Sequence, residues 1–280
     1  MVELAFVSRP ERPQWESVSR DGLHLHFRAD LEPALAAAYA NHTWVYDALR
    51  AQPGVQLFRG RRPVVGGWLG GTRVVVKRMY HGGLFGKLGR DRFLSCARVR
   101  AHHALAEYLS EAGIETAPVV FASWRRVRGL YRCEIGFELV DGIDADRYFF
   151  GATPPPAGWE RRAAELGRRV ARLHQVGFRH GDLNLMNFLF RRDGRVCILD
   201  LDKSKVLGRP LTTAEGAPNL DRLERSIRKQ GRRHAPEFVE AIIRKVRDAY
   251  REAFVEPEDH RNLGLAIVSW GIALATLPLA

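Results

Sequence analysis

The first half of the chain alternates hydrophobic and polar residues in short runs that are rich in β-branched residues. The runs occupy residues 55–60, 64–69, 72–77, 119–127 and 131–140. Glycine-containing turns separate most of them, and alternation bounded by turn residues is typical of antiparallel strands joined in hairpins. A shorter alternation at residues 23–27 indicates an edge strand. The first half therefore predicts an antiparallel sheet.

In other segments the apolar residues recur every three or four positions, which is the spacing of one face of a helix. These segments are residues 93–112 and 159–176. Residues 31–50, which are rich in alanine, and residues 219–230 and 236–254, which carry many Arg and Lys, are also predicted to be helical. The clearest is residues 159–176, where Leu166, Val170 and Leu173 share a face. Strands come first and helices later, with one helix among the strands. This order predicts an α+β protein with a small, antiparallel, β-rich N-terminal lobe and a larger helical C-terminal lobe.

The same pattern suggests how the chain divides. We expect an N-terminal extension of strand and helix over residues 1–54, a small lobe over residues 55–140 and a larger lobe over residues 141–280. Residues 263–280 contain no charged residue, and this length is at the lower limit for a membrane span. We expect a buried or docking helix there, with attachment to a membrane interface or a true span as open alternatives.

The segment with the clearest chemistry reads His-Gly-Asp-Leu-Asn-Leu-Met-Asn at residues 180–187. It is followed by a strand, a turn and a second strand that ends at Asp200. Asp182 can accept the proton of an attacking hydroxyl, and Asn187 and Asp200 can hold Mg²⁺ against the phosphates of ATP. We expect His180 to hold the backbone of the loop. This spacing resembles the catalytic segment of the protein-kinase-like superfamily, in its His-Gly-Asp form.

A lysine upstream of this segment fits the same chemistry. Lys77 closes a run of valines, and a lysine at such a strand end can neutralise the α- and β-phosphates of ATP. Its acidic partner should come from the next helix, where we assign Glu107. His102 and His103 stand closer to the expected position, but we interpret them as structural or surface residues. Asp202 is a further metal ligand, a supporting carboxylate or a surface residue.

The loop over the nucleotide is expected between the first two strands of the small lobe. There the backbone N–H groups of Gly60, Arg61 and Arg62 could contact phosphate oxygens, and Arg61 or Arg62 could add charge. The loop lacks the three-glycine pattern of protein kinases. The glycine pairs at residues 66–67 and 70–71 are interpreted as ordinary hairpin and bulge glycines.

The formal net charge of +12 and the pI near 10.2 favour an anionic partner. The three cysteines, Cys96, Cys133 and Cys197, are widely spaced, which excludes a disulfide framework and a zinc motif. No charged-then-apolar signal follows Met1, so we expect a cytoplasmic protein.

Several segments resemble the bacterial lipopolysaccharide kinase family, which phosphorylates Kdo or heptose of the lipid A inner core. They read Lys-Arg-Met-Tyr-His-Gly-Gly-Leu at residues 77–84, Gly-Arg-Asp-Arg-Phe at 89–93, the motif at 180–187, Leu-Asp-Leu-Asp at 199–202, and Asn-Leu-Asp-Arg-Leu-Glu-Arg-Ser-Ile-Arg-Lys at 219–229. The resemblance implies an ATP- and Mg²⁺-dependent kinase that acts on a sugar hydroxyl of an anionic glycolipid, peripherally at the cytoplasmic face of the inner membrane. It leaves the acceptor sugar open.

Under this interpretation, clusters of basic residues would dock the acceptor and the membrane surface. The expected residues are Arg78, Lys87, Arg90 and Arg92 near the nucleotide, and Arg222, Arg225 and Lys229 at helical spacing.

Three alternatives remain at this point. A small-molecule kinase of the aminoglycoside or choline kinase type shares the His-Gly-Asp motif, although such enzymes usually carry an acidic pocket for cationic substrates. A RIO-like protein kinase is less favoured, because no Ala-Pro-Glu-like anchor follows Asp200. A non-catalytic basic protein, such as a pseudokinase scaffold or a nucleic-acid binder, would also explain the charge. No nucleic-acid-binding signature supports the last possibility.

Overall fold

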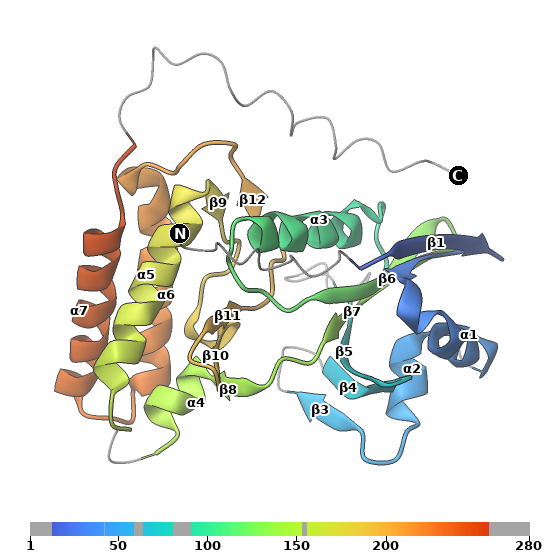
Figure 1. Cartoon of the computed structure of the whole chain (residues 1–280), viewed down its shortest axis with the longest axis horizontal. Coiled ribbons are helices and arrows are strands. Elements are labelled where there is room, and N and C mark those ends of the chain that lie inside the picture. Colours follow the sequence, from blue (N-terminus) through green and yellow to red (C-terminus); the bar gives the residue numbers. More distant parts are fainter. Residues whose placement is uncertain (1–12, 42, 59–63, 81–90, 153–155, 258–280) are drawn as a thin grey trace, which may run out of the picture. The chain divides into compact units, whose positions relative to one another are not determined.

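The computed structural model describes residues 13–41, 43–58, 64–80, 91–152 and 156–257. The chain forms two compact units (Figure 1). The first lies within Met1–Cys96 and Val119–Glu138, and the second within Ala97–Pro118 and Leu139–Ala280. An antiparallel sheet in the N-terminal region and a helical C-terminal part confirm the predicted α+β class. The boundaries expected at residues 54/55 and 140/141 stay a prediction.

The first unit is built on one sheet, whose seven described strands are all antiparallel. They are β1 (Trp15–Arg20), β2 (Leu23–Arg28), β3 (Gln56–Phe58), β4 (Val64–Leu69), β5 (Thr72–Arg78), β6 (Val119–Val127) and β7 (Leu130–Glu138). Their order is β1-β2-β6-β7-β5-β4-β3. The prediction of an edge strand near residues 23–27 is wrong, because β2 lies between β1 and β6. The strongly exposed β1 takes the edge instead.

A short helix pair packs on this sheet where one helix over residues 31–50 was expected. It consists of α1 (Glu32–Asn41) and α2 (Val45–Arg50), preceded by the 3₁₀ turn η1 (Ala29–Leu31). Their apolar residues form one core with buried residues of β2, β4, β5 and β6. Its fully buried members include Leu35, Leu49, Val74 and Val76. In β5 the alternation therefore places Val74 and Val76 toward the helices and Lys77 on the opposite face.

A buried carboxylate explains why the helix divides. Glu134 of β7 is fully buried, and it accepts hydrogen bonds from the backbone N–H of Val45 (2.9 Å) and of Tyr46 (3.1 Å). The hydroxyls of Tyr39 (3.0 Å) and Ser123 (3.3 Å) also donate to it. The first N–H groups of a helix have no partner within that helix, so this carboxylate fixes a second helix start. Burial raises the pKa of Glu134, and the hydrogen bonds from Tyr46, Val45 and Tyr39 oppose the shift.

Replacing this carboxylate should therefore destabilise the first unit. In Glu134→Gln one carboxylate oxygen is replaced by an NH₂ group, which cannot accept the hydrogen bonds that the oxygen accepts from the surrounding N–H and O–H groups. We expect the free energy of unfolding to fall by about 2 kcal/mol. Urea unfolding measures the change. The control is Glu138→Gln, which alters a half-exposed carboxylate of the same strand that is paired with Arg28, and it should cost less than about 1 kcal/mol. Equal losses in both variants would contradict this account.

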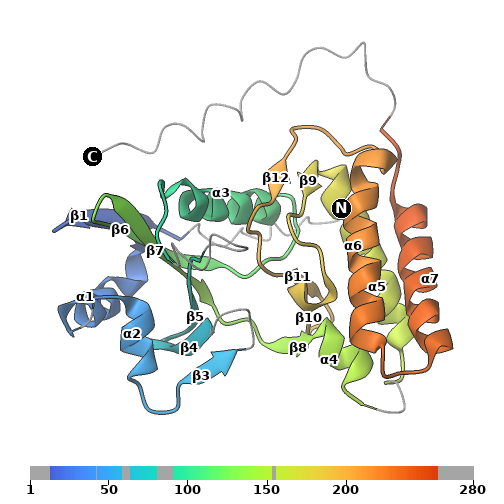
Figure 2. The same ribbon diagram turned by 180° about the vertical axis from the view of Figure 1, so that it is seen from behind.

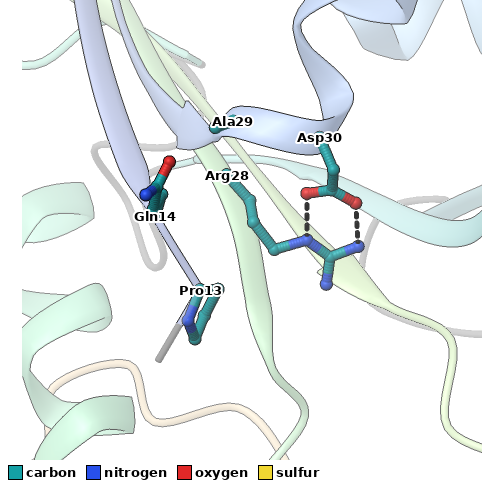
Figure 3. Close-up of a pocket in the computed structure, with 5 residues that line it drawn as sticks. All are labelled: Pro13, Gln14, Arg28, Ala29 and Asp30. Atoms are coloured by element: carbon teal, nitrogen blue, oxygen red, sulfur yellow. Dashed lines mark hydrogen bonds and ion pairs between the residues drawn. The ribbon is translucent and has the colours of Figure 1, made fainter. Parts of the chain in front are cut away.

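The first unit also has a hollow at its N-terminal end, lined by Pro13, Gln14, Arg28, Ala29 and Asp30 (Figure 3). The guanidinium of Arg28 donates to both carboxylate oxygens of Asp30, at 2.6 and 2.8 Å, and to Glu138 at 3.1 Å. Because the positive charge is already shared by two carboxylates, this hollow has little attraction for an anionic ligand.

The second unit contains five helices and three short strand pairings among its described residues. The helices are α3 (Ala97–Glu111), α4 (Ala145–Phe150), α5 (Trp159–Gln175), α6 (Thr213–Gly231) and α7 (Pro236–Ala253). The strands are β8 (Gly142–Asp144), β9 (Phe178–Arg179), β10 (Phe188–Arg191), β11 (Val196–Ile198) and β12 (Lys205–Val206). They pair as β11-β10-β8 and β12-β9. Helices α5, α6 and α7 lie side by side in both views (Figure 2).

Two of these helices begin at residues that local periodicity did not predict. Helix α3 starts at Ala97 because Phe93 forms a β-bridge with Tyr131, through two N–H···O bonds of 2.7 Å. Helix α6 starts at Thr213, where Thr212 and Glu215 form a capping box. In the described part of the chain, no helix is long and apolar enough to cross a membrane. The apolar segment at residues 263–280 lies outside the described residues.

Candidate active site

The loop between β9 and β10 is held by a buried histidine. The Nε2 of His180 donates to the carbonyl of Leu199 at 3.2 Å, and its Nδ1 accepts from the backbone N–H of Asp182 at 3.1 Å. Burial lowers the pKa of His180, so the ring is neutral at pH 7 and can make both bonds. The imidazole thus connects the loop to the segment that precedes Asp200.

One oxygen of the Asp182 carboxylate accepts two hydrogen bonds and also lies in an ion pair with Arg222. Arg222 of α6 donates to Oδ1 through Nε at 2.6 Å, and its Nη2 lies 2.5 Å from the same oxygen. The side-chain amide of Asn184 donates to Oδ1 at 3.2 Å. Asn184 also caps the short 3₁₀ turn η3 (Leu185–Asn187), because its Oδ1 accepts from the N–H of Met186 at 3.0 Å. The carboxylate is therefore held by the loop and by a distant helix.

Asn187 lies between this loop and the strand that leads to Asp200. Its Nδ2 donates to the carbonyl of Asp182 at 2.8 Å, and its own carbonyl accepts from the N–H of Leu199 at 2.8 Å. The hairpin of β10 and β11 therefore brings Asp182, Asn187 and Asp200 onto adjacent segments of one unit. Because Nδ2 is engaged, the side-chain oxygen of Asn187 is the atom that could bind a cation.

Asp200 has a left-handed backbone, with φ of 56°. Non-glycine residues rarely adopt this conformation, and asparagine and aspartate tolerate it best. Such strained residues cluster at functional sites, so the backbone at Asp200 supports a role for its carboxylate.

The oxygen atoms of this site suit a Mg²⁺ ion that is bound partly by substrate, and they do not form a site in which protein side chains alone would bind a metal. Mg²⁺ usually takes one or two carboxylates and completes its coordination with substrate phosphates and water. Within residues that the structure describes, no group of three or more His, Cys, Asp or Glu side chains could hold a metal. Asn187 and Asp200 therefore fit a metal that arrives with a nucleotide. Their roles as metal ligands, and that of Asp182 as base, stay predictions.

The nearby Asp202 forms an ion pair with Arg98 of α3. Only 14% of the Asp202 side chain is exposed, so it is not a solvated surface charge. A hydrogen bond from the N–H of Ile198 to the carbonyl of Glu115 (2.9 Å) attaches the residues after α3 to β11. Helix α3 is thus attached to the segment that follows the loop of residues 180–187.

The two predicted nucleotide-binding side chains lie in different units. Lys77 pairs in register with Ile135 in the sheet of the first unit. Glu107 lies in α3 of the second unit, where 59% of its side chain is exposed and its carboxylate is 3.4 Å from His103. The buried face of α3 carries His102 instead. The pairing of Lys77 with Glu107 stays a prediction.

Some predicted residues lie outside the described part of the chain. They are Gly60 and Arg61 of the expected phosphate-binding loop, and Lys87 and Arg90 of the expected basic cluster. Their roles also stay predictions.

Sequence reasoning assigns Arg222 to acceptor or membrane docking and does not find its contact with Asp182. It also misses Asn219 and Ser226, which contact the same loop. The spacing of Asn219, Arg222 and Ser226 could have indicated this shared role, because residues three and four positions apart lie on one face of a helix.

Comparisons with known proteins give a consistent picture. The profile of the "Lipopolysaccharide kinase (Kdo/WaaP) family" matches residues 56–250. A 3-deoxy-D-manno-octulosonic acid kinase of Stenotrophomonas maltophilia (strain K279a) is 31% identical over 186 residues, which is 64% of this chain and 72% of the relative. Kinases of the same name from Haemophilus influenzae (strain Rd; 29% over 192 residues, 65% and 77%) and Pasteurella multocida (strain Pm70; 32% over 179 residues, 61% and 72%) are also similar.

Proposed function

The chain belongs to the lipopolysaccharide kinase (Kdo/WaaP) family, and from that premise we propose that it phosphorylates a sugar hydroxyl of the lipopolysaccharide inner core. Family membership makes it a phosphotransferase with an alcohol group as acceptor and implies ATP as the donor. Relatives that are 29–32% identical are named 3-deoxy-D-manno-octulosonic acid (Kdo) kinases. Kdo attached to lipid A is therefore our first choice of acceptor, and heptose of the core is the second.

One observation carries the chemistry: the loop and hairpin that bring Asp182, Asn187 and Asp200 together in the second unit. The hydroxyl oxygen of the sugar attacks the γ-phosphorus and forms a new P–O bond. The bond from the γ-phosphorus to the β,γ-bridging oxygen breaks, and its electron pair leaves with ADP. Asp182 accepts the proton of the hydroxyl.

The remaining residues bind the donor. Mg²⁺ held by Asn187 and Asp200 would neutralise charge on the phosphates. Lys77 would contact the α- and β-phosphates, with Glu107 as its proposed acidic partner and Gly60 and Arg61 over the phosphates. Two observations support this assignment: the motif at residues 180–187 resembles that of the protein-kinase-like superfamily, and Lys77 lies near the end of β5.

The basic surface suits an anionic acceptor at a membrane. Helix α6 and the residues that follow it carry exposed cations that point into solvent, namely Arg225, Lys229, Arg232 and Arg233. Such residues are attracted by the negative surface potential of the cytoplasmic leaflet. We therefore propose peripheral contact with the inner face of the membrane that holds lipid A.

A transfer assay tests the proposed function. Purified protein is incubated with γ-labelled ATP, Mg²⁺ and one of three acceptors: lipid A carrying Kdo, heptosylated core, or an aminoglycoside. We expect label in the Kdo lipid, with chelation of Mg²⁺ abolishing it. The aminoglycoside is the control for the small-molecule kinase alternative. Label in the aminoglycoside with none in either core lipid would overturn the proposal.

A further inference from the structure

One face of helix α6 contacts the catalytic loop at three successive points. Asn219, Arg222 and Ser226 follow one another at spacings of three and four residues, so their side chains lie along one side of the helix. Asn219 contacts the backbone of His180, Arg222 contacts the carboxylate of Asp182, and Ser226 contacts the N–H of Leu185. The three contacts span the loop from its beginning to the start of η3.

The first contact fixes the backbone before Asp182. The side-chain amide of Asn219 donates to the carbonyl of His180 at 2.9 Å and accepts from its N–H at 3.2 Å. His174 of α5, buried beside it, lies 3.3 Å from the same amide oxygen and 2.9 Å from the hydroxyl of Tyr250 in α7. Burial lowers the pKa of His174 to about 4, so this ring is neutral. Helices α5 and α7 thus support the orientation of Asn219.

The second contact holds the carboxylate of Asp182. The Nε of Arg222 donates to Oδ1 at 2.6 Å, and its Nη2 lies 2.5 Å from the same oxygen in an ion pair. The Nδ2 of Asn184 also donates to Oδ1 at 3.2 Å. The carboxylate is therefore oriented both by its own loop and by α6. The third contact, from the N–H of Leu185 to the hydroxyl of Ser226 (3.1 Å), holds the far end of the loop.

We propose that this face of α6 positions the catalytic loop, and that Arg222 is a positioning residue that holds the carboxylate of Asp182 in the orientation that receives the proton of the acceptor hydroxyl. The inference rests on the proposed role of Asp182 as the base. The side chains of Arg222 and Asp182 are 45% and 32% exposed, so the ion pair contributes little to the stability of the fold. Its effect should appear in catalysis.

The kinetic test separates positioning from docking of the acceptor. In Arg222→Gln we expect kcat to fall about 100-fold, because small displacements of a reacting group have effects of this size. The KM values for ATP and for the Kdo lipid should stay within about threefold of wild type. Arg222→Lys keeps one charged donor and should recover about tenfold of the loss. A large rise in the acceptor KM with an unchanged kcat would show a docking residue and overturn the inference.

The control is Arg161→Gln on α5, the same chemical change at an exposed arginine with no proposed role in binding or catalysis, and it should have wild-type kcat. A second readout does not depend on the acceptor. Hydrogen exchange of the peptide covering residues 180–187 should be faster in Arg222→Gln than in Arg161→Gln, at equal Tm. If the wild-type protein does not phosphorylate a core lipid, the proposed function fails. Hydrogen exchange still tests whether Arg222 positions the loop of residues 180–187. Equal exchange in both variants would overturn the positioning role.

Discussion

Asp182→Asn should lower the rate of phosphoryl transfer by about a thousandfold, while binding of Mg-ATP stays within a few-fold of wild type. The carboxamide cannot take the hydroxyl proton, and general-base catalysis typically contributes 10²–10⁴-fold. The amide oxygen of the variant can still accept from Arg222, so the loop should keep its conformation. Initial rates with the Kdo lipid measure the first quantity, and calorimetric titration with Mg-ATP measures the second.

The matched control is Asp221→Asn, an identical chemical change at an exposed residue of α6. It should transfer phosphate at the wild-type rate. If Asp182→Asn were as active as this control, Asp182 would not be the base. If Asp182→Asn lost binding of Mg-ATP instead, the carboxylate of Asp182 would serve to bind the nucleotide, and another group would accept the proton of the hydroxyl.

The second large effect is expected at Asp200. Saturation with Mg-ATP at a hundredfold its Kd stabilises a protein by about 2.7 kcal/mol, which raises the Tm of a chain of this size by roughly 5–10 °C. In Asp200→Asn this shift should be largely lost, because a neutral amide is a weak ligand for Mg²⁺. Asparagine tolerates the left-handed backbone at this position, so the substitution tests the carboxylate without adding strain.

Thermal unfolding with ATP, in Mg²⁺ and in chelator, measures this shift. The control is Asp193→Asn, which changes an aspartate in the turn of the same hairpin, paired with Arg195. It should keep the wild-type response to Mg-ATP. A full Mg²⁺-dependent shift in Asp200→Asn would remove this residue from the metal site.

Local pattern predicted most of the elements correctly. Residues 64–69 and 72–77 form β4 and β5, and the turn between β6 and β7 falls where Arg128 and Gly129 take left-handed backbones. The hairpin after the loop of residues 180–187 was also predicted, and it is formed by β10 and β11. These features depend on residues that are close in the sequence, so alternation and turn chemistry are enough to specify them.

Long-range contacts decided the features that the pattern did not predict. The division into α1 and α2 depends on Glu134, which is 89 residues from Val45 in the sequence. The interior position of β2 depends on its pairing with β6. Neither contact leaves a periodic signal near the affected segment, because the partner residue lies in another element.

The sequence by itself determined the fold class, the order of strands and helices, and the spacing of Asp182, Asn187 and Asp200, because each follows from local periodicity or a short motif. Only the tertiary structure decided which atoms surround the carboxylate of Asp182. Arg222 is 40 residues away in the sequence and looks like a surface charge, but the packing of α6 brings its guanidinium to Oδ1. A charged side chain acquires its partner from the fold, and sequence spacing alone does not specify that partner.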